Sequence, residues 1–442
     1  MEELLLPSLS GAADKAQDGG PPADEVRPIR KPSILFLTHY FPPEGNAPAS
    51  RVHELCKRWV RDGCAVTVIT CAPNVPDGKV YEGYRNRLTQ TEEIDGIQVI
   101  RVWTFIAANK GTVLRLVNYV SYMFSAALRA LLVTRPDVII ASSPQLFCGW
   151  SGVITRWTRR RPLILEMRDL WAESIVTLTS VDRGRLLRAL EWLEFRMYDS
   201  ARHIVTVGEG YRRQLIERGV PSERITIITN GVDREFFAPR DRDEDLADQL
   251  GVRGRFVCSY IGTIGMASGL DVVLRAGHRL KRRNRDDIVF LLVGDGAIRE
   301  SLQARVAELQ LNNVILTGRQ PKSRIPAYLS ISGCSLVHLR RAPLYTTVLP
   351  SKIFEAAHMK RPIVLGVEGE AARVVTASGG GICIEPDNEE QLLEAVERLA
   401  DDPALRERLG QAGHDYVVQH YDRDRLARDY LGFIDQVLGR PG

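Results

Sequence analysis

The segment Leu349-Pro350-Ser351-Lys352-Ile353-Phe354-Glu355 combines a cation and a carboxylate at helical spacing. Pro350 and Ser351 favour a helix start, so Lys352 lies in the first turn and Glu355 follows on the same face. A cation there opposes the helix dipole by roughly 0.3–1 kcal/mol at an exposed site, unless an anion is also bound. A diphosphate would be such an anion, and the carboxylate could accept hydrogen bonds from two neighbouring hydroxyls, as on a ribose. The alternative is a surface ion pair between Lys352 and Glu355.

Two glycine-rich turns follow predicted strands. The turn Tyr260-Ile261-Gly262-Thr263-Ile264-Gly265 leads into a helix, and its backbone N–H groups suit a phosphate. The turn Gly294-Asp295-Gly296 allows close approach of a ligand to the backbone, although Gly-Asp-Gly is also an ordinary turn. Neither has the Gly-x-Gly-x-x-Gly dinucleotide signature or the Lys-Ser/Thr ending of a P-loop. NAD-dependent enzymes and ATPases are therefore disfavoured.

The first half of the chain has a charged strand end of its own. The segment Glu166-Met167-Arg168-Asp169-Leu170-Trp171-Ala172-Glu173-Ser174 places charged side chains around Trp171. Such charges are costly to bury unless they are paired or used for binding. Arg168, Asp169 and Glu173 are therefore candidate contacts for a second substrate. The alternative is that Arg168 pairs with Asp169 or Glu166.

The loop Phe41-Pro42-Pro43-Glu44-Gly45-Asn46-Ala47-Pro48 precedes a predicted helix and could face the same site. Glu44, Gly45 and Asn46 are its candidate contacts, because a glycine permits close approach of a substrate. The alternative is that the loop is only a rigid, proline-rich connection.

Short apolar runs rich in β-branched residues alternate with helical patterns along most of the chain. The runs predict strands at 33–38, 65–70, 98–102, 138–141, 163–166, 203–207, 256–261, 288–293, 314–317, 335–339, 363–366 and 381–384. The patterns predict helices that include 50–61, 269–282, 297–309, 323–331, 351–359 and 389–400. This order indicates an α/β protein with two Rossmann-like, doubly wound parallel sheets facing a cleft. In such sheets ligands bind beyond the carboxyl ends of the strands, where the turns described above lie.

The length of 442 residues is more than one core usually fills, so two domains are expected. Residues 1–32, with Gly19-Gly20-Pro21-Pro22 and scattered charges, are typical of a disordered tail. We expect a first domain at 33–232 and a second at 233–415, with the charged stretch 240–245 acting as a linker or helix start. The remaining residues, 416–442, are expected to form a helix that packs back on the first domain.

The composition excludes several classes. A net charge of +4 from 59 basic and 55 acidic side chains is too small to indicate nucleic-acid binding. The seven cysteines include no Cys-x-x-Cys pair, which favours a reducing, cytoplasmic compartment. No segment approaches the ~20 apolar residues of a membrane-spanning helix, and the leader lacks the order of a secretory signal.

Two segments of the first half suit the surface of an anionic bilayer. Residues 111–135 are apolar with arginines as the only charges, and residues 150–161 interleave tryptophan with arginine. Peripheral contact with the cytoplasmic membrane face would suit a lipid-linked acceptor. The alternative is a core helix followed by a solvated basic helix end.

Taken together, these segments resemble the family 4 glycosyltransferases of the glycosyltransferase-B fold, over about 33 to 435. The likeness is strongest to the branch that builds bacterial surface polysaccharides, including colanic-acid and amino-fucose transferases. The segments that carry it are His39-Tyr40-Phe41-Pro42-Pro43-Glu44, Ala141-Ser142-Ser143-Pro144, Arg168-Asp169-Leu170-Trp171-Ala172-Glu173-Ser174, Thr229-Asn230-Gly231-Val232-Asp233, Leu292-Val293-Gly294-Asp295-Gly296 and Pro350-Ser351-Lys352-Ile353-Phe354-Glu355.

The resemblance implies a nucleotide-sugar donor, favoured as a UDP-sugar, held mainly by the second domain. It implies a lipid-linked or glycan acceptor held mainly by the first domain, and transfer with retention of anomeric configuration without a metal or other cofactor. Lys352 would contact the diphosphate, Glu355 the ribose hydroxyls and the turn at Gly318-Arg319 the base, with Lys352 and Glu355 as the catalytic pair. The full set of expected donor contacts is Gly262, Thr263, Gly294, Asp295, Gly318, Arg319, Arg340, Pro350, Ser351, Lys352, Ile353 and Glu355.

The chain also departs from the family pattern. Glu355 matches the second acid of a Glu-x7-Glu motif, but Thr347 stands at the first position. Thr263 and Ser268 occupy places where the family often has an arginine and a lysine. Lys352, together with Arg340 or Arg341, is then expected to supply the missing positive charge. These departures keep two alternatives open, a catalytically weak nucleotide-sugar-binding or scaffolding protein and a nucleotide-sugar epimerase of the same fold.

Overall fold

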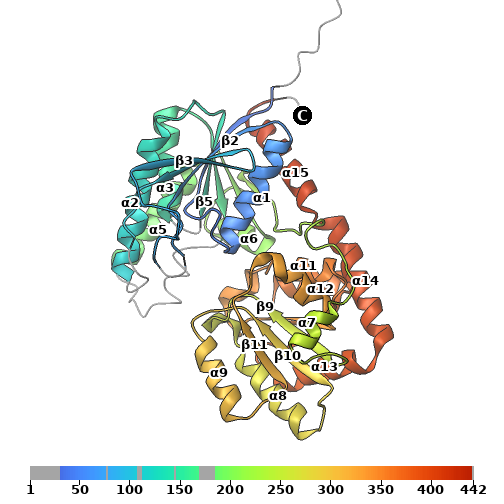
Figure 1. The fold of residues 1–442 in the computed structure, drawn as a ribbon. Coiled ribbons are helices and arrows are strands. Elements are labelled where there is room, and N and C mark those ends of the chain that lie inside the picture. Colours follow the sequence, from blue (N-terminus) through green and yellow to red (C-terminus); the bar gives the residue numbers. More distant parts are fainter. Residues whose placement is uncertain (1–29, 76–77, 107–111, 144–145, 169–184, 441–442) are drawn as a thin grey trace, which may run out of the picture. The chain divides into compact units, whose positions relative to one another are not determined.

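The computed structural model describes residues 30–75, 78–106, 112–143, 146–168 and 185–440 (Figure 1). The tail expected at 1–32 therefore lies almost wholly outside the described residues.

The first half of the chain forms an eight-stranded sheet in which β3 alone runs antiparallel to its neighbour. Apolar, β-branched runs form its central strands because these are covered on both faces. In spatial order the strands are β3 (Thr89–Ile94), β4 (Ile97–Val102), β2 (Ala65–Cys71), β1 (Ser33–Leu37), β5 (Val138–Ser143), β6 (Leu163–Met167), β7 (His203–Thr206) and β8 (Ile225–Ile227).

Helices cover both faces of this sheet (Figure 1). One face packs against α2 (Thr112–Ala130), α3 (Leu146–Arg159), α5 (Arg185–Ser200) and α6 (Glu209–Glu217). The other face packs against α1 (Ala47–Arg61) and α15 (Arg423–Val437). No helix in the described ranges is long and apolar enough to cross a bilayer.

The second half forms a six-stranded parallel sheet. In spatial order its strands are β11 (Val314–Gly318), β10 (Ile288–Val293), β9 (Phe256–Ile261), β12 (Cys334–His338), β13 (Ile363–Gly366) and β14 (Gly381–Cys383). Its helices are α7 (Glu244–Gln249), α8 (Asp271–Arg282), α9 (Arg299–Glu308), α10 (Ile325–Ser330), α11 (Lys352–His358), α12 (Glu370–Ser378), α13 (Glu389–Asp401) and α14 (Pro403–His420). Short 3₁₀ turns are η1 (Ser222–Arg224), η2 (Met266–Ser268), η3 (Lys322–Arg324) and η4 (Pro343–Thr347).

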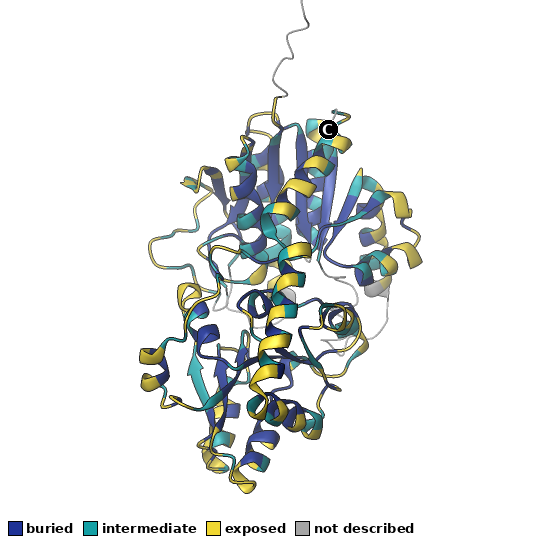
Figure 2. Cartoon of the chain, turned by 90° about the vertical axis from the view of Figure 1, so that its right-hand side faces the viewer, coloured by how far each residue is buried: buried dark blue, intermediate teal, exposed yellow. Residues whose placement is uncertain are grey.

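The expected fold class is confirmed, because both halves contain a doubly wound sheet of parallel strands between helices. Figure 2 shows the buried strands inside and the exposed helix surfaces outside. Every expected strand is present within two residues of its expected bounds. Strand β3, which the sequence did not indicate, is a polar edge strand, Thr-Gln-Thr-Glu-Glu-Ile, and therefore lacks the apolar run of a buried strand.

The C-terminal segment differs from the single helix expected from residue 416. The helical conformation is interrupted at Tyr421, between α14 and α15. The carboxylate of Asp422 then caps α15 by accepting a hydrogen bond from the N–H of Asp424. Val232 and Asp422 form an isolated bridge at this break. The buried residues Tyr430 and Ile434 then pack in the same core as Trp59 of α1.

Candidate functional site

The expected donor contacts come from neighbouring loops of the second sheet. Gly318 ends β11, Gly294 follows β10, Gly262 follows β9, and the segment from Arg340 to Glu355 follows β12. Since β11, β10, β9 and β12 are adjacent and parallel, their following loops lie along one edge of the sheet.

The turns after β9 and β10 are joined by backbone hydrogen bonds. The N–H of Gly262 donates to Val293 O at 2.9 Å, and the N–H of Gly294 donates to Gly318 O at 3.0 Å. Gly294 has φ of 150°, and a Cβ on it would lie 1.9 Å from Gly262 O. The close approach that this glycine permits is therefore to another backbone segment. Asp295 is likewise engaged within the turn, since its Oδ1 accepts from Arg299 Nε at 2.9 Å.

Lys352 lies against the turn after β9. Its Nζ is 3.9 Å from the ring centroid of Tyr260 and would be 2.8 Å from a Cβ placed on Gly262. Within the part of the chain that the structure describes, no carboxylate lies within ion-pair distance of this ammonium group. The surface ion pair with Glu355, considered above, is thus not formed. A cation held beside a glycine turn without a counter-ion favours the binding of an anion there.

Glu355 is half-buried, and its carboxylate has no hydrogen-bond or ion-pair partner among the described residues. Burial raises the pKa of this carboxyl group, while the charges of Arg423, Lys322 and Lys352 act in the opposite direction. The carboxylate oxygens are therefore available to accept hydrogen bonds from hydroxyl groups.

Of three further expected donor residues, Ile353 and Arg340 have side chains engaged elsewhere, whereas Ser351 does not cap its helix. Ile353 is 1% exposed in the apolar core around Phe354, so only its backbone could contact a ligand. The hydroxyl of Ser351 makes no capping hydrogen bond, although α11 begins directly after it, as expected. Arg340 Nη2 is 3.3 Å from Asp271 Oδ2, so the guanidinium already has a carboxylate partner.

Arg341 and the two positions that depart from the family pattern, Thr263 and Ser268, also lie at this edge of the second sheet. Arg341 pairs with Glu368 and Glu385, so among the described residues Lys352 is the cation without a counter-ion beside the turn after β9. Thr263 is exposed, whereas Ser268 is buried and its hydroxyl donates to Gly265 O at 2.5 Å. Arg319 is exposed at the end of β11, so the structure leaves it free to reach a ligand.

Glu44 does not face a substrate as expected. It is 3% exposed, and its Oε1 accepts from the N–H groups of Asn74 at 2.9 Å and Val75 at 3.1 Å. The carboxylate therefore ties the loop after β1 to the loop after β2. Burial raises its pKa, and the two N–H groups and Arg101 partly counter this effect.

Gly45 and Asn46 follow at the start of α1. A Cβ on Gly45 would meet nothing within 4 Å, so a substrate has room to approach it. Asn46 caps α1, since its Oδ1 accepts from the N–H of Ala49 at 2.9 Å.

Arg168 lies at the carboxyl end of β6, and of its two expected partners Glu166 is within ion-pair distance while Asp169 is not described. Glu166 is fully buried and bound to Arg51 at 3.0 Å, and Arg168 Nε is 3.9 Å from the same oxygen. Arg168 also donates to the carbonyls of Ser143 and Pro48. Burial lowers the pKa of this guanidinium, and Glu166 raises it. Asp169 and Glu173 lie outside the described residues.

Comparison with known proteins shows the family of the chain. Residues 46–231 match the Glycosyl transferase 4-like domain family, and residues 231–416 match the Glycosyl transferases group 1 family. The chain belongs to these glycosyltransferases.

Two relatives illustrate the range of the family. WcaI of Escherichia coli (strain K12), which carries the designation of a colanic acid biosynthesis glycosyl transferase, is 24% identical over 415 residues, covering 91% of this chain and 99% of WcaI. The alpha-D-kanosaminyltransferase of Streptomyces kanamyceticus is 26% identical over 253 residues, covering 56% of this chain and 64% of the relative.

Solved structures show the same fold. HepE of Anabaena in complex with UDP and glucose aligns with a TM-score of 0.68 at 18% identity, covering 91% of this chain and 99% of HepE. Sucrose-phosphate synthase from Thermosynechococcus elongatus aligns with a TM-score of 0.69 at 18% identity, covering 93% of this chain and all of that chain. The resemblance to the glycosyltransferase-B fold is thereby confirmed.

The glycosyltransferase contains a buried histidine at the donor edge that the sequence did not indicate. His338 Nε2 accepts from the N–H of Asp387 at 2.9 Å, so Nδ1 carries the proton and donates to Ser268 O at 2.8 Å. Burial lowers the pKa of His338, which keeps the ring neutral. This histidine fixes the turn before α8 to the loop after β14. No local pattern marks it, because its partners lie 70 and 49 residues away.

The first sheet of the transferase has buried polar atoms without partners at its carboxyl edge. Nδ1 of His39 and the hydroxyls of Ser142 and Ser143 have none within the described ranges. Burial lowers the pKa of His39 to about 3, so the ring is neutral at physiological pH. Unpaired buried polar groups are costly, and here they follow β1 and end β5, where a ligand is expected. The motif His39 to Glu44 carried the resemblance, but it did not single out this ring.

Glu370 of the transferase is a further buried group whose role the sequence did not indicate. It is 7% exposed and accepts from the N–H of Glu209 at 2.9 Å and of Gly210 at 2.8 Å. These are the first N–H groups of α6, whose own N-cap residue, Gly208, offers no side chain. Thr347 lies against the same glycine, because a Cβ on Gly210 would be 2.7 Å from its methyl group. Thr347, which stands at the first position of the Glu-x7-Glu motif, therefore lies beside the carboxylate of Glu370.

Proposed function

We propose that this glycosyltransferase moves a sugar from a UDP-sugar to a lipid-linked or glycan acceptor, with retention of configuration, in surface polysaccharide synthesis. The observation that carries the proposal is that Lys352, beside Gly262, and the carboxylate of Glu355 both lack a charged partner among the described residues. One group suits a diphosphate and the other suits ribose hydroxyls.

Relatives support the donor and the pathway. HepE, which shares the fold, has been solved with UDP and with UDP-glucose. WcaI is named for colanic acid biosynthesis, and TuaH of Bacillus subtilis for teichuronic acid biosynthesis. The retention of configuration rests on the family resemblance.

The reaction explains the residue types. As the bond between the sugar and the diphosphate breaks, negative charge grows on the leaving group. A fixed ammonium group and oriented backbone N–H groups stabilise that charge more in the transition state than in the ground state. In this proposal Lys352 and the turn after β9 supply the stabilisation, and no metal ion takes part.

A thermal-shift screen of UDP, GDP, ADP and their sugars tests the donor, because a ligand that binds only the folded state raises its stability. We expect UDP to raise the Tm most, with the shift unchanged in EDTA. Transfer to lipid-linked and glycan acceptors is then measured in EDTA, with the anomeric configuration of the product read by NMR. A shift that depends on a divalent cation, or a product of inverted configuration, would contradict the mechanism.

Two outcomes would favour other functions. Binding of UDP without hydrolysis or transfer across a broad acceptor panel would indicate the catalytically weak binding or scaffolding protein. Interconversion of the donor sugar without an acceptor would indicate the epimerase. The open space at Gly45 and the unpartnered groups near Arg168 favour an acceptor on the first sheet.

We also propose that an anionic bilayer contacts a stripe of exposed apolar side chains on α2. Leu114, Val117, Phe124 and Leu128 are 41%, 43%, 55% and 65% exposed. Their spacing of three, seven and four residues places them on one helix face. The opposite face, with Tyr122, is buried against the first sheet, so α2 is apolar both inward and outward.

Arginines border this α2 stripe, and neither α2 nor α3 contains an acidic residue. Arg159 of α3 donates to the carbonyls of Leu131 and Val133, so the basic end of α3 adjoins the end of the stripe. Leu132 and Trp157 are 78% and 58% exposed there. Apolar side chains edged by arginine match an anionic lipid surface, which would hold a lipid-linked acceptor.

Vesicle flotation tests this contact. The double change Phe124→Ser and Leu128→Ser should weaken partitioning to anionic vesicles by about tenfold or more, because each side chain gains roughly 1.5–3 kcal/mol on full burial. Leu88→Ser is the matched control, since Leu88 is 83% exposed next to β3. Equal recovery of both variants, or no recovery of the parent protein, would exclude the α2 stripe.

A further inference from the structure

A cavity of about 560 Å³ lies at the amino ends of the strands of the second sheet, at the opposite edge from the donor contacts. Gly254 to Val257 precede and begin β9, Asp287 precedes β10, Gly333 precedes β12 and Arg361 precedes β13. The cavity is within the usual size of small-molecule sites. Its arginines are Arg240, Arg242, Arg255, Arg361 and Arg406, and its acids are Asp241 and Asp287.

Except for Arg361, the arginines that line this cavity donate hydrogen bonds to carbonyl groups. Arg242 donates to the carbonyls of Ile331 and Val252, and Arg406 donates to those of Leu399 and Ala400. A carbonyl orients a guanidinium but does not cancel its charge. Arg242 also pairs with Glu244 at 3.5 Å, and Asp287 is paired with Arg285, but no ion pair to Arg406 exists among the described residues.

Arg361 is the least compensated of these cations. Its buried Nε has no hydrogen-bond partner, and no ion pair to it exists within the described ranges. Burial lowers its pKa, and the charges of Arg242 and Arg406 lower it further. The guanidinium of Arg361 is therefore repelled by the guanidinium groups of Arg242 and Arg406.

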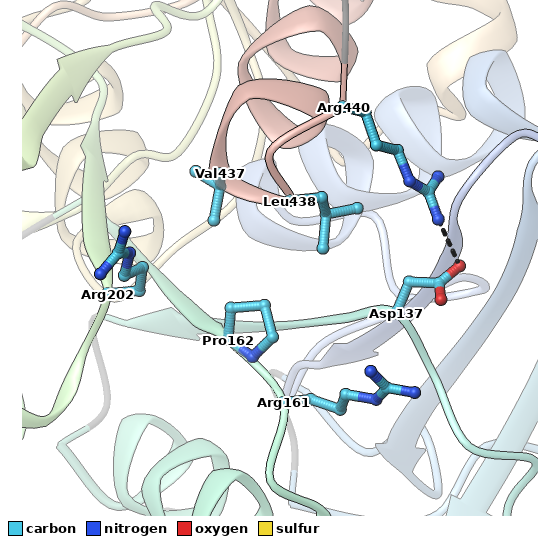
Figure 3. Close-up of a pocket in the computed structure, with 7 residues that line it drawn as sticks. All are labelled: Asp137, Arg161, Pro162, Arg202, Val437, Leu438 and Arg440. Carbon is cyan, nitrogen blue, oxygen red and sulfur yellow. Dashed lines mark ion pairs between the residues drawn. The ribbon is translucent and has the colours of Figure 1, made fainter. Parts of the chain in front are cut away.

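A pocket at the corresponding edge of the first sheet provides a contrast. This 390 Å³ pocket is also lined by three arginines, Arg161, Arg202 and Arg440 (Figure 3). Here Asp137 supplies the opposite charge, at 3.1 Å from Arg440. In the cavity of the second sheet, no described carboxylate lies within ion-pair distance of Arg361.

We propose that the cavity around Arg242, Arg361 and Arg406 is a binding site for a small phosphate-bearing anion, separate from the donor site. Guanidinium groups match phosphate oxygens with paired hydrogen bonds. Three converging cations suit a group with two or more negative charges. The cost of bringing them together is recovered when that anion binds.

The test is calorimetric titration of the full chain, saturated with UDP, with inorganic phosphate, pyrophosphate and glucose 1-phosphate in separate arms. We expect one of these to bind once, and Arg361→Met to weaken it about tenfold or more, as for loss of a charged hydrogen bond. Lys352→Ala and Arg408→Met should leave it unchanged. Arg408 is an exposed arginine on the same helix as Arg406, and so is the matched control.

A second measurement separates binding from a structural role. If Arg361 is repelled by its neighbours, Arg361→Met should keep or raise the Tm without ligand and abolish the rise caused by the anion. Arg361→Lys should retain the repulsion and bind more weakly than the parent protein. Failure of Arg361→Met to fold, a lower Tm without ligand, loss of binding in Lys352→Ala alone, or no binding in any arm would overturn the proposal.

Discussion

At the scale of single residues, the environment of a side chain decides its role more than its type. Lys352 and Glu44 are both charged residues in family motifs. The ammonium group of Lys352 has no counter-ion in the described part of the chain, whereas the carboxylate of Glu44 accepts hydrogen bonds from two backbone N–H groups. Lys352 is therefore expected to contact the substrate, and Glu44 is expected to stabilise the fold.

Lys352→Ala should reduce kcat by roughly 10²–10³, the range seen when one transition-state charge stabiliser is removed. The free energy of unfolding should change little, because the ammonium group has no ion pair in the described structure. Initial rates and urea unfolding measure the two effects. Lys79→Ala is the control, since Lys79 is exposed in the first half. Equal turnover in Lys352→Ala and the parent protein would remove its catalytic role.

The acid limb of the pH profile should report Glu355. Burial raises the pKa of this carboxyl group, so it takes up a proton at a higher pH than an exposed glutamate. The KM for the donor should therefore rise as the pH falls through that pKa. In Glu355→Gln the KM should be about tenfold higher at neutral pH, for loss of a charged acceptor, and independent of pH.

Although Glu355→Gln should weaken donor binding, it should not lower the stability of the fold. A raised pKa means that the ionised form destabilises the fold, so this contribution is favourable at low pH and is lost as the pH rises. Glu355→Gln should then be at least as stable as the parent at neutral pH. A destabilised variant with an unchanged pH profile would contradict both expectations.

At the scale of elements, the start of α6 is completed by a residue from another element. Gly208 has an extended backbone, with φ of −171°, and no side chain to cap the helix. Glu370 at the beginning of α12 supplies the carboxylate instead. The absence of a side chain on Gly208 is required because the carboxylate occupies that space.

Gly208→Ala should destabilise the protein by about 1–3 kcal/mol, as overpacking does, because the new Cβ would lie 2.5 Å from Glu370 Oε1. Glu370→Ala should cost about 1–3 kcal/mol for two unsatisfied N–H groups. The double variant should cost less than the sum, since the clash disappears. Denaturant unfolding of all four proteins closes the cycle, and additive costs would argue against the clash. Gly45→Ala, with no atom within 4 Å, is the control.

At the scale of the whole molecule, the end of the chain completes the core of its beginning. Tyr430 and Ile434 of α15 are fully buried with Trp59, whose Nε1 donates to Ala427 O at 3.0 Å. Arg58 of α1 also pairs with Asp424 at 2.8 Å. The first sheet is therefore covered on this face only after the last helix is in place.

Ile434→Ala should lower the free energy of unfolding by about 2–5 kcal/mol, the usual cost of such a core truncation. Gln436→Ala, two residues away on the exposed side of α15, should have little effect. Chemical denaturation measures both. An equal cost for the two changes would mean that α15 does not contribute to the core.

Local patterns in the sequence predicted most of the elements. Ile288 to Val293 and Phe256 to Ile261 are runs of apolar residues, and each is a strand with the expected bounds. Such runs are informative because a parallel strand covered on both faces must be apolar along its length. The edge strands β3 and β8, which were not expected, and the single C-terminal helix were the errors, since polar or very short edge strands and helix breaks leave a weaker pattern.

The sequence by itself determined the fold class, the order of elements and the positions of Lys352 and Glu355 on one helical turn. Only the tertiary structure decided that Lys352 lies against Gly262, that Glu44 is buried and that Glu370 caps α6. The physical reason is the distance along the sequence over which each interaction acts. Hydrophobic periodicity acts between neighbours along the chain, whereas burial, charge compensation and capping here depend on residues 30 to 161 positions apart.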